Sequence, residues 1–311
     1  MRIAALLITA CLTLTAHAGP QDSVKPYPAR KIAPDTWVIT GPLGEPSVQN
    51  QGFMNNPGWI IAGDQVVVID PGSSVQAGRM VVNAIKKTTG LPVTTVYNTH
   101  IHGDHWLGNQ AILDAWPKAV LIAHPDMIAQ AKASEAESWV RLMDQLTRGF
   151  TKGTRAAIPT VATYDGMTSR IGTRAFKVHS SNDAHSKTDI MIEVDNGVLF
   201  TGDNVLNGRI GRLDDGTFKG NIRAIDNGLA TQPKVVVPGH GKAGGIAVLQ
   251  AQRDYFQTLY DTVKVEYNAG KSDFEMKPVV AKKLAAYKNW NGFDAALGRL
   301  ISLAILEIEQ E

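Results

Sequence analysis

Three histidines and one aspartate lie within six positions of the segment Thr99–His105, whose sequence is THIHGDH. The segment follows the β-branched run Val93–Tyr97, which we predict to be a strand. Imidazole nitrogens and carboxylate oxygens together are suitable ligands for zinc and other borderline divalent ions. Gly103 is expected to let the backbone turn tightly, so that the side chains on both sides of it converge. This segment therefore predicts a metal site at the end of a strand.

Three further candidate ligands lie much later in the chain, each in a glycine-bearing turn or just beyond a predicted strand. His185 lies in the sequence DAHS, and Asp203 follows the predicted strand Val198–Thr201 in TGDN. His240 follows the predicted strand Val235–Val237 in PGHG. Residues in such places are exposed but held by a rigid scaffold, as binding and catalytic residues often are. Together with the first motif, their order predicts that they complete one site.

The order of these motifs, HxHxDH followed by a histidine, GD and GH, resembles that of the metallo-β-lactamase-fold hydrolase superfamily. The resemblance extends over about residues 35–245, and Asp70 in VIDPG matches an aspartate that the family has at an early strand end. It implies an α/β fold, a four-layer αββα sandwich with a two-metal site at the shared edge of the sheets. The residues that carry it are His100, His102, Asp104, His105, His185, Asp203 and His240.

The resemblance also implies how the ligands are divided between two metal ions. One ion would be held by His100, His102 and His185. The other would be held by Asp104, His105 and His240, and Asp203 would bridge the two. Asp70 would support the ligands from behind. The implied cofactors are two zinc ions, with iron or manganese as alternatives.

Such a metal pair determines the chemistry that we expect. Two zinc ions about 3.5–4 Å apart lower the pKa of a shared water and polarise a carbonyl. We therefore expect a metal-bound hydroxide to cleave an ester, thioester, lactone or amide-type bond in a small-molecule substrate. Asp104 is the expected catalytic residue, because it can orient the hydroxide and relay a proton to the leaving group.

Two departures from the family pattern bear on the alternatives. Asp203 stands where zinc β-lactamases of the thiolate-using subclass have a cysteine, which disfavours β-lactam hydrolysis without removing it. His102 stands where the diiron, oxygen-reducing branch has a glutamate. The alternatives are a periplasmic β-lactamase, a mononuclear iron oxygenase of the same fold, and a non-catalytic metal-binding accessory protein of a quinoprotein or sulfur-oxidation system.

Residues 1–18 have the pattern of a cleaved secretory signal: a basic start at Arg2, an apolar run over Ile3–Leu14, and Ala-His-Ala before Gly19. The run is too short to cross a bilayer, so we expect no stable membrane anchor after cleavage and a periplasmic or secreted protein. The one cysteine, Cys11, lies within this signal. A formal charge of +2, from 31 basic and 29 acidic residues, indicates no nucleic-acid partner. The oligomeric state stays open.

We expect residues 19–311 to form a single domain, with a core over about 35–245 and C-terminal helices over about 246–311. Hydrophobic patterning predicts a helix over Gln76–Lys87 and another from Asp126, the latter with one apolar face and a stop at Gly149. That face contains Trp139, Leu142, Met143 and Leu146. Further predicted strands are Thr36–Thr40, Trp59–Ala62, Gln65–Asp70, Ala119–Ala123, Arg174–Ser180 and Asp189–Val194.

Two loops, Gly41–Pro57 and Asn204–Gly220, are expected to select the substrate. The candidate contacts are Phe53, Met54, Trp106, Asn109, Asn204 and Arg209, and Arg209 and Arg212 are candidates for pairing with an anionic group. Other residues are assigned structural roles. We expect His124 at a helix start, His179 on an exposed strand face, Glu135 on a solvated helix face, and Trp290 and Phe293 in packing.

Overall fold

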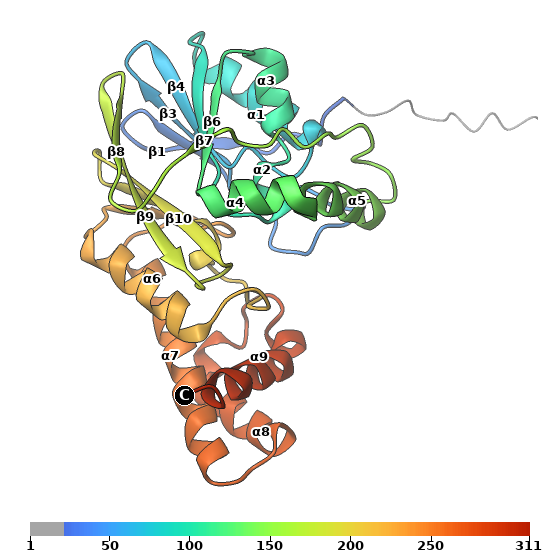
Figure 1. Cartoon of the computed structure of the whole chain (residues 1–311), viewed down its shortest axis with the longest axis vertical. Coiled ribbons are helices and arrows are strands. Elements are labelled where there is room, and N and C mark those ends of the chain that lie inside the picture. Colours follow the sequence, from blue (N-terminus) through green and yellow to red (C-terminus); the bar gives the residue numbers. More distant parts are fainter. Residues whose placement is uncertain (1–21) are drawn as a thin grey trace, which may run out of the picture.

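The computed structural model describes residues 22–311, so the expected secretory signal at residues 1–18 lies outside the described residues. Two β-sheets pack face to face, and helices cover their outer faces (Figure 1). This is the four-layer αββα sandwich expected from the sequence. Within residues 22–311, no helix is both long and apolar enough to cross a membrane.

The first sheet contains seven strands in the order β1 to β7, antiparallel from β1 to β4 and parallel from β4 to β7. Helices α1 (Val75–Thr88) and α3 (Asn109–Ala115) pack on its outer face. The strands are β1 (Ala29–Ala33), β2 (Thr36–Ile39), β3 (Gly58–Ala62), β4 (Gln65–Ile69), β5 (Val93–Tyr97), β6 (Val120–Ala123) and β7 (Val161–Ala162).

The second sheet contains five strands in the order β12-β11-β10-β9-β8, and only β11 and β12 are parallel to each other. Helices α6 (Phe218–Ala230) and α7 (Ala247–Asn268) share a hydrophobic core with its outer face. The strands are β8 (Thr168–Ile171), β9 (Arg174–Asn182), β10 (Thr188–Val194), β11 (Val198–Phe200) and β12 (Val235–Val237).

Strand alternation explains the two-sided burial of the first sheet. In β4, Val67 and Ile69 face the second sheet, while Val66 and Val68 face α1 and α3. Complete burial of each such side chain stabilises the fold by roughly 1.5–3 kcal/mol. The strands that the sequence predicts agree with these elements to within about two residues. Elements β1, β7, β8, α3 and α6 were not predicted, because short or mixed segments give little periodic signal.

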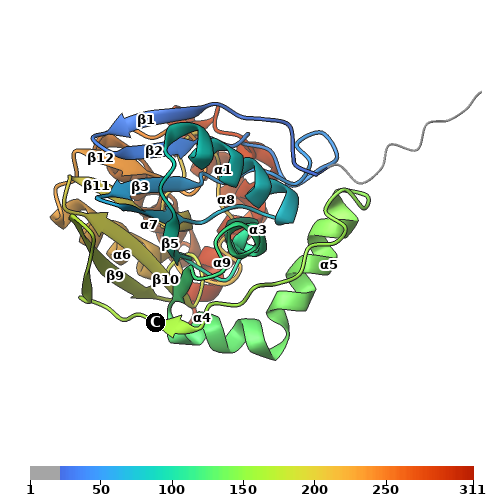
Figure 2. The ribbon, with the colours of Figure 1, turned by 90° about the horizontal axis from the view of Figure 1, so that it is seen from above.

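A helical arm stands at the side of the sandwich and is formed by α4 (Pro125–Gln130), the π-helical turn η1 (Ala131–Glu135) and α5 (Ala136–Leu146) (Figure 2). The sequence predicts one helix here, and the structure differs because the π turn interrupts it. His124 begins the arm as expected, since its Nδ1 accepts a hydrogen bond from the Asp126 backbone N–H. The arm ends before Gly149, whose φ of +87° suits a glycine.

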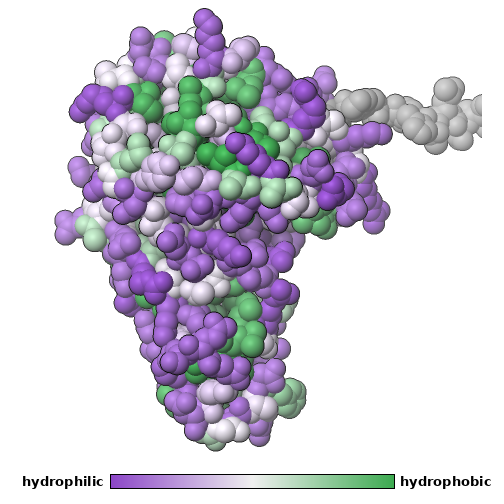
Figure 3. Space-filling view, in the orientation of Figure 1, coloured by the Kyte–Doolittle hydropathy of each residue, from purple (hydrophilic) through white to green (hydrophobic). Residues whose placement is uncertain are grey.

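The C-terminal helices form a bundle of α7, α8 (Asp273–Lys283), the 3-10 turn η3 (Ala285–Tyr287) and α9 (Phe293–Ile308). Their apolar stripes face inward, and Trp290 and Phe293 pack there as predicted. Hydrophilic residues cover most of the face of this bundle that Figure 3 shows. A short parallel bridge joins Arg209 to Asn291, so the bundle is bonded to the loop that follows β11.

Candidate metal centre

The seven predicted ligands lie close together at one end of the sandwich, although they come from four separate segments of the chain. The segment after β5 supplies four of them, and the short helix α2, which begins at Gly103, carries Asp104 and His105. The turn between β9 and β10 supplies His185, and the 3-10 turn η2 after β11 supplies Asp203. The segment after β12 supplies His240. Parallel pairing of β11 with β12 brings the last two segments to the same edge.

The three-histidine group consists of His100, His102 and His185, whose candidate ligand atoms lie within 4.8 Å of one another. His185 Nε2 lies 2.9 Å from His102 Nδ1. His100 Nε2 is buried and has no hydrogen-bond partner among residues 22–311, while its Nδ1 lies 2.9 Å from Thr99 Oγ1. A buried polar atom without a partner is destabilising. A metal ion in front of His100 Nε2 would supply that partner, so the group fits a metal.

The carboxylate group consists of Asp104, His105 and His240, whose candidate ligand atoms also lie within 4.8 Å of one another. His240 Nε2 is 3.2 Å from Asp104 Oδ2 and 3.2 Å from Asp203 Oδ2. Asp203 also lies 3.1 Å from His105 Nε2 and 3.6 Å from His185 Nε2. Asp203 is therefore placed between the two groups, which is the geometry that a bridging ligand requires.

Asp70 supports both groups through buried hydrogen bonds. Its Oδ2 lies 2.8 Å from His105 Nδ1 and accepts a hydrogen bond of 2.6 Å from Thr99 Oγ1. Its Oδ1 accepts a hydrogen bond of 2.9 Å from the Thr99 backbone N–H. Thr99 in turn contacts His100, so one carboxylate orients a histidine in each group. Such supporting contacts fix the ring orientation of metal-ligating histidines.

The two groups differ in their electrostatics. Burial lowers the pKa of His100 well below its usual value and that of His185 to about 3, and neighbouring histidines add to the effect. Burial also opposes protonation of His105 and His240. There, however, the carboxylates of Asp203 and Asp104 outweigh it and raise both pKa values.

Asp215 is a functional candidate that sequence reasoning missed. Its Oδ2 lies 3.1 Å from His102 Nε2, and this hydrogen bond lowers the pKa of the carboxyl group. Because His102 Nδ1 faces His185, Asp215 orients the ring from its far side. Asp215 lies within the loop predicted to select substrate, but 113 residues separate it from His102. No local pattern indicates a contact over that separation.

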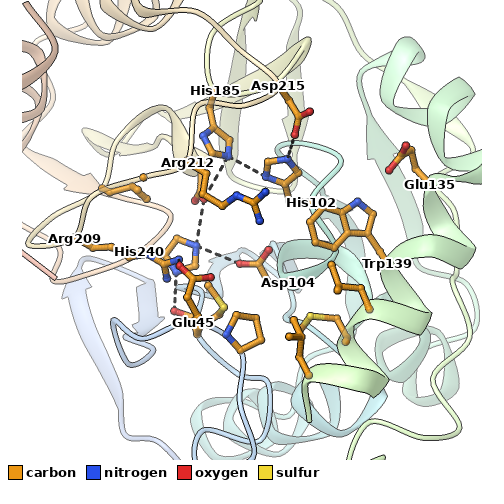
Figure 4. Close-up of a pocket in the computed structure, with 18 of the residues that line it drawn as sticks. Glu45, His102, Asp104, Glu135, Trp139, His185, Arg209, Arg212, Asp215 and His240 are labelled. Carbon is orange, nitrogen blue, oxygen red and sulfur yellow. Dashed lines mark hydrogen bonds and ion pairs between the residues drawn. The ribbon is translucent and has the colours of Figure 1, made fainter. Parts of the chain in front are cut away.

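A cavity of about 280 Å³ opens beside the ligands. Figure 4 shows Trp139 of α5 on one side of it, and Arg209, Arg212 and His240 on the opposite side. Asp104 faces the space between them. The volume is near the lower end of the range for small-molecule sites, roughly 300–1,000 Å³.

The predicted substrate contacts divide into two sets. Met54, Arg209 and Arg212 line the cavity as expected. Glu135, which we expected only on a solvated helix face, is exposed but also lines it. His179 lies 2.7 Å from Glu193 on β10 and is largely buried rather than exposed, because this contact covers part of its ring.

Four other expected contacts are corrected by the structure, because their polar atoms or rings are buried elsewhere. Phe53 packs in the core against Tyr27. Trp106 is fully buried and donates its Nε1–H to the Ile101 carbonyl. The remaining two are also fully buried: Asn109 pairs with Asn98, and Asn204 lies against the His185 backbone.

Gly103 has a different role from the one that its place in the motif suggested. It is absent from the residues with positive φ and begins α2, so the turn does not require a glycine conformation. A Cβ atom at this position would lie 2.7 Å from Trp139 Cβ. The glycine is needed because α5 packs directly against the metal-binding motif.

Comparison with known proteins gives matches of three kinds. Residues 50–240 match the sequence model described as the metallo-beta-lactamase superfamily. A hydroxyacylglutathione hydrolase from Prochlorococcus marinus is 38% identical over 72 residues, which is 23% of this chain. That alignment spans only 26% of the relative's own length.

Two solved structures show the same fold at low sequence identity. A metallo-beta-lactamase from Pontibacter korlensis superposes with a TM-score of 0.60 at 19% identity, covering 74% of this chain and 99% of that chain. A stereoselective inverting sec-alkylsulfatase from Pseudomonas sp. superposes with a TM-score of 0.68 at 15% identity, covering 90% of this chain and 50% of that chain.

Proposed function

Because this chain belongs to the metallo-β-lactamase superfamily, we propose that it is an exported binuclear zinc hydrolase that cleaves an ester, thioester, lactone or amide-type bond in a small molecule. The observation that carries the proposal is the pair of ligand groups that share Asp203. The histidine and carboxylate donors, without a cysteine, suit zinc. When bound, the metal pair supplies a Lewis acid and an activated water nucleophile.

The residues of the chain divide the remaining work. The three-histidine group would hold one ion, the carboxylate group would hold the second, and Asp203 would bridge them. Asp104 faces the cavity, and its carboxylate is held by His240 Nε2 at 3.2 Å. From this place Asp104 can orient the nucleophile and pass a proton to the leaving group. Asp70 and Asp215 act through His105 and His102, which they orient.

The proposal is tested on zinc-quantified protein with a panel of ester, thioester, lactone, lactam and phosphodiester substrates. We expect about two zinc ions per chain and turnover of one carbonyl substrate that stops on chelation and returns with zinc. Asp203→Ala should lose metal and activity, whereas Asp261→Ala, an exposed aspartate on α7, should keep both. Turnover that persists without metal contradicts the proposal, and one iron per chain favours an oxygenase instead.

Export is the part of the proposal that rests on residues 1–18 alone. Expression of the full chain in a Gram-negative host should give a periplasmic protein whose N-terminus is at or near Gly19. Recovery of the uncleaved chain in the cytoplasm would argue against export while leaving the hydrolase proposal intact.

A further inference from the structure

We propose that the apolar face of α5, formed by Trp139, Leu142, Met143 and Leu146, binds an alkyl or aryl group of the substrate next to the bond that is cleaved. The inference deepens the proposed function and rests on it. We call this face the α5 wall. All four residues line the same cavity as the ligands His102, Asp104, His185 and Asp203.

The α5 wall lies directly beside the ligands. The ring centroid of Trp139 is 5.1 Å from that of His102, and the missing side chain of Gly103 permits this approach. The π-helical turn η1 comes immediately before α5. Such turns are rare and occur frequently at functional sites. A substrate carbonyl placed at the ligand groups therefore has the α5 wall as its neighbour.

The packing of α5 against the rest of the protein does not explain why part of the α5 wall is exposed. Met143 is buried and anchors the helix, but Leu142 and Leu146 are 37% and 42% exposed. With Trp139 they recur at positions i, i+3 and i+7, so they share one side of the helix. Trp139 and Met143 also pack against the core below the arm, whereas Leu142 and Leu146 open into the cavity, where exposed apolar side chains are suited to bind an apolar ligand group.

The opposite side of the cavity is charged, but its arginines are already paired within the chain. Arg209 is largely buried and binds Glu45 at 2.6 Å. Arg212 binds Asp214 at 2.9 Å. Because each arginine already has a carboxylate partner that offsets its charge, binding in this cavity does not require a strongly charged substrate. The substrate is therefore inferred to present its apolar group to α5 and its scissile bond to the metals.

The cavity also limits the size of that group. At about 30 Å³ per water molecule, 280 Å³ corresponds to roughly nine waters. A chain of about four to six carbons, or one aromatic ring, occupies roughly half of this volume and leaves the rest for the group that is cleaved. The structure thus favours short alkyl or aryl acyl compounds over long lipids.

The test measures the binding of acetate, butanoate and hexanoate to the zinc-loaded protein by isothermal titration calorimetry. A fully buried methylene tightens binding about four-fold, so contact with one wall should give about two-fold per methylene. Hexanoate should therefore bind about 16-fold more tightly than acetate, with a more negative heat-capacity change. Equal affinities for the three acids would overturn the proposal.

Variants show whether α5 causes the trend. In Leu142→Ser/Leu146→Ser, the advantage of hexanoate over acetate should fall to about two-fold, and Leu142→Met/Leu146→Met should retain it. The matched control is Leu306→Ser, because this leucine on α9 is 54% exposed and lies outside the cavity. It should keep the full trend. A full trend in the serine double variant, with unchanged zinc content and thermal stability, also overturns the proposal.

Turnover measured on the same samples separates this inference from the proposed function. If binding depends on chain length but no carbonyl substrate is hydrolysed, the result supports apolar binding at the α5 wall and contradicts the proposed reaction. Hydrolysis without dependence on chain length would contradict the α5 wall alone. A chain that binds no zinc and no carboxylate would contradict both.

Discussion

The three-histidine group and the carboxylate group lie side by side and share Asp203, but they differ in how they bind protons. Burial holds the pKa of His100 and His185 low, so these rings are neutral and ready to bind a metal. Carboxylates raise the pKa of His105 and His240, so these rings hold protons more strongly, and a metal must compete with those protons. The two halves of one pocket therefore present different electrostatic environments to any metal ion that binds there.

The largest effects should follow the removal of one ligand from each group. We expect His185→Ala and His240→Ala each to lose one equivalent of zinc and to lower kcat/KM by on the order of 10³-fold, because a two-metal site stabilises the transition state by several kcal/mol. The zinc content of each purified variant and its kcat/KM are the measurements. If either variant loses both ions, the two groups do not bind metal independently.

Acidification should affect the groups unequally. As the pH falls from 8 to 6, protons compete with zinc for His105 and His240, whose pKa values are raised, so zinc binding at the carboxylate group should weaken first. The pKa of His185, about 3, means that this ring remains neutral over the same range. Dialysis at a fixed free zinc concentration should therefore show one equivalent lost before the other. If both ions are lost over the same pH range, the two groups do not differ in how protons compete with zinc.

A smaller, matched pair of effects should come from the residues that orient each group. Asp70→Asn should weaken zinc binding about 10–100-fold, mainly at the carboxylate group, because Asp70 is buried against His105. Asp215→Asn should weaken it less and at the three-histidine group, because the Asp215 side chain is largely exposed. Competitive zinc chelation provides both affinities. The reverse order would show that burial does not determine the strength of these contacts.

The smallest expected effect concerns the C-terminal bundle. Arg299 of α9 binds Asp214, which also binds Arg212 beside the cavity. Exposed ion pairs contribute about 0.2–1 kcal/mol, so Arg299→Ala should change KM by no more than about five-fold and leave zinc content unchanged. A five-fold loss of zinc affinity in Arg299→Ala would show that the bundle positions the metal ligands in addition to the loop.

The sequence predicted the strands well because their signal is local, and the structure brings the seven predicted ligand residues together. Runs such as Val93–Tyr97 and Val235–Val237 have the composition of buried strands, and the structure places strands at those residues. The resemblance that THIHGDH carries implied the later ligands in order. The π turn in the arm and the role of Gly103 were not predicted, because each depends on how α5 packs against α2.

By itself, the sequence determined the strands and the candidate ligand residues, and the resemblance of its motifs implied the fold class, since strand composition, donor types and motifs are properties of short segments. Only the tertiary structure decided which residues surround those ligands. It placed Asp215 behind His102, turned Phe53 and Trp106 into the core, and opened Leu142 and Leu146 to the cavity. The physical reason is that burial and contact between distant segments arise from packing of the whole chain, which no local pattern contains.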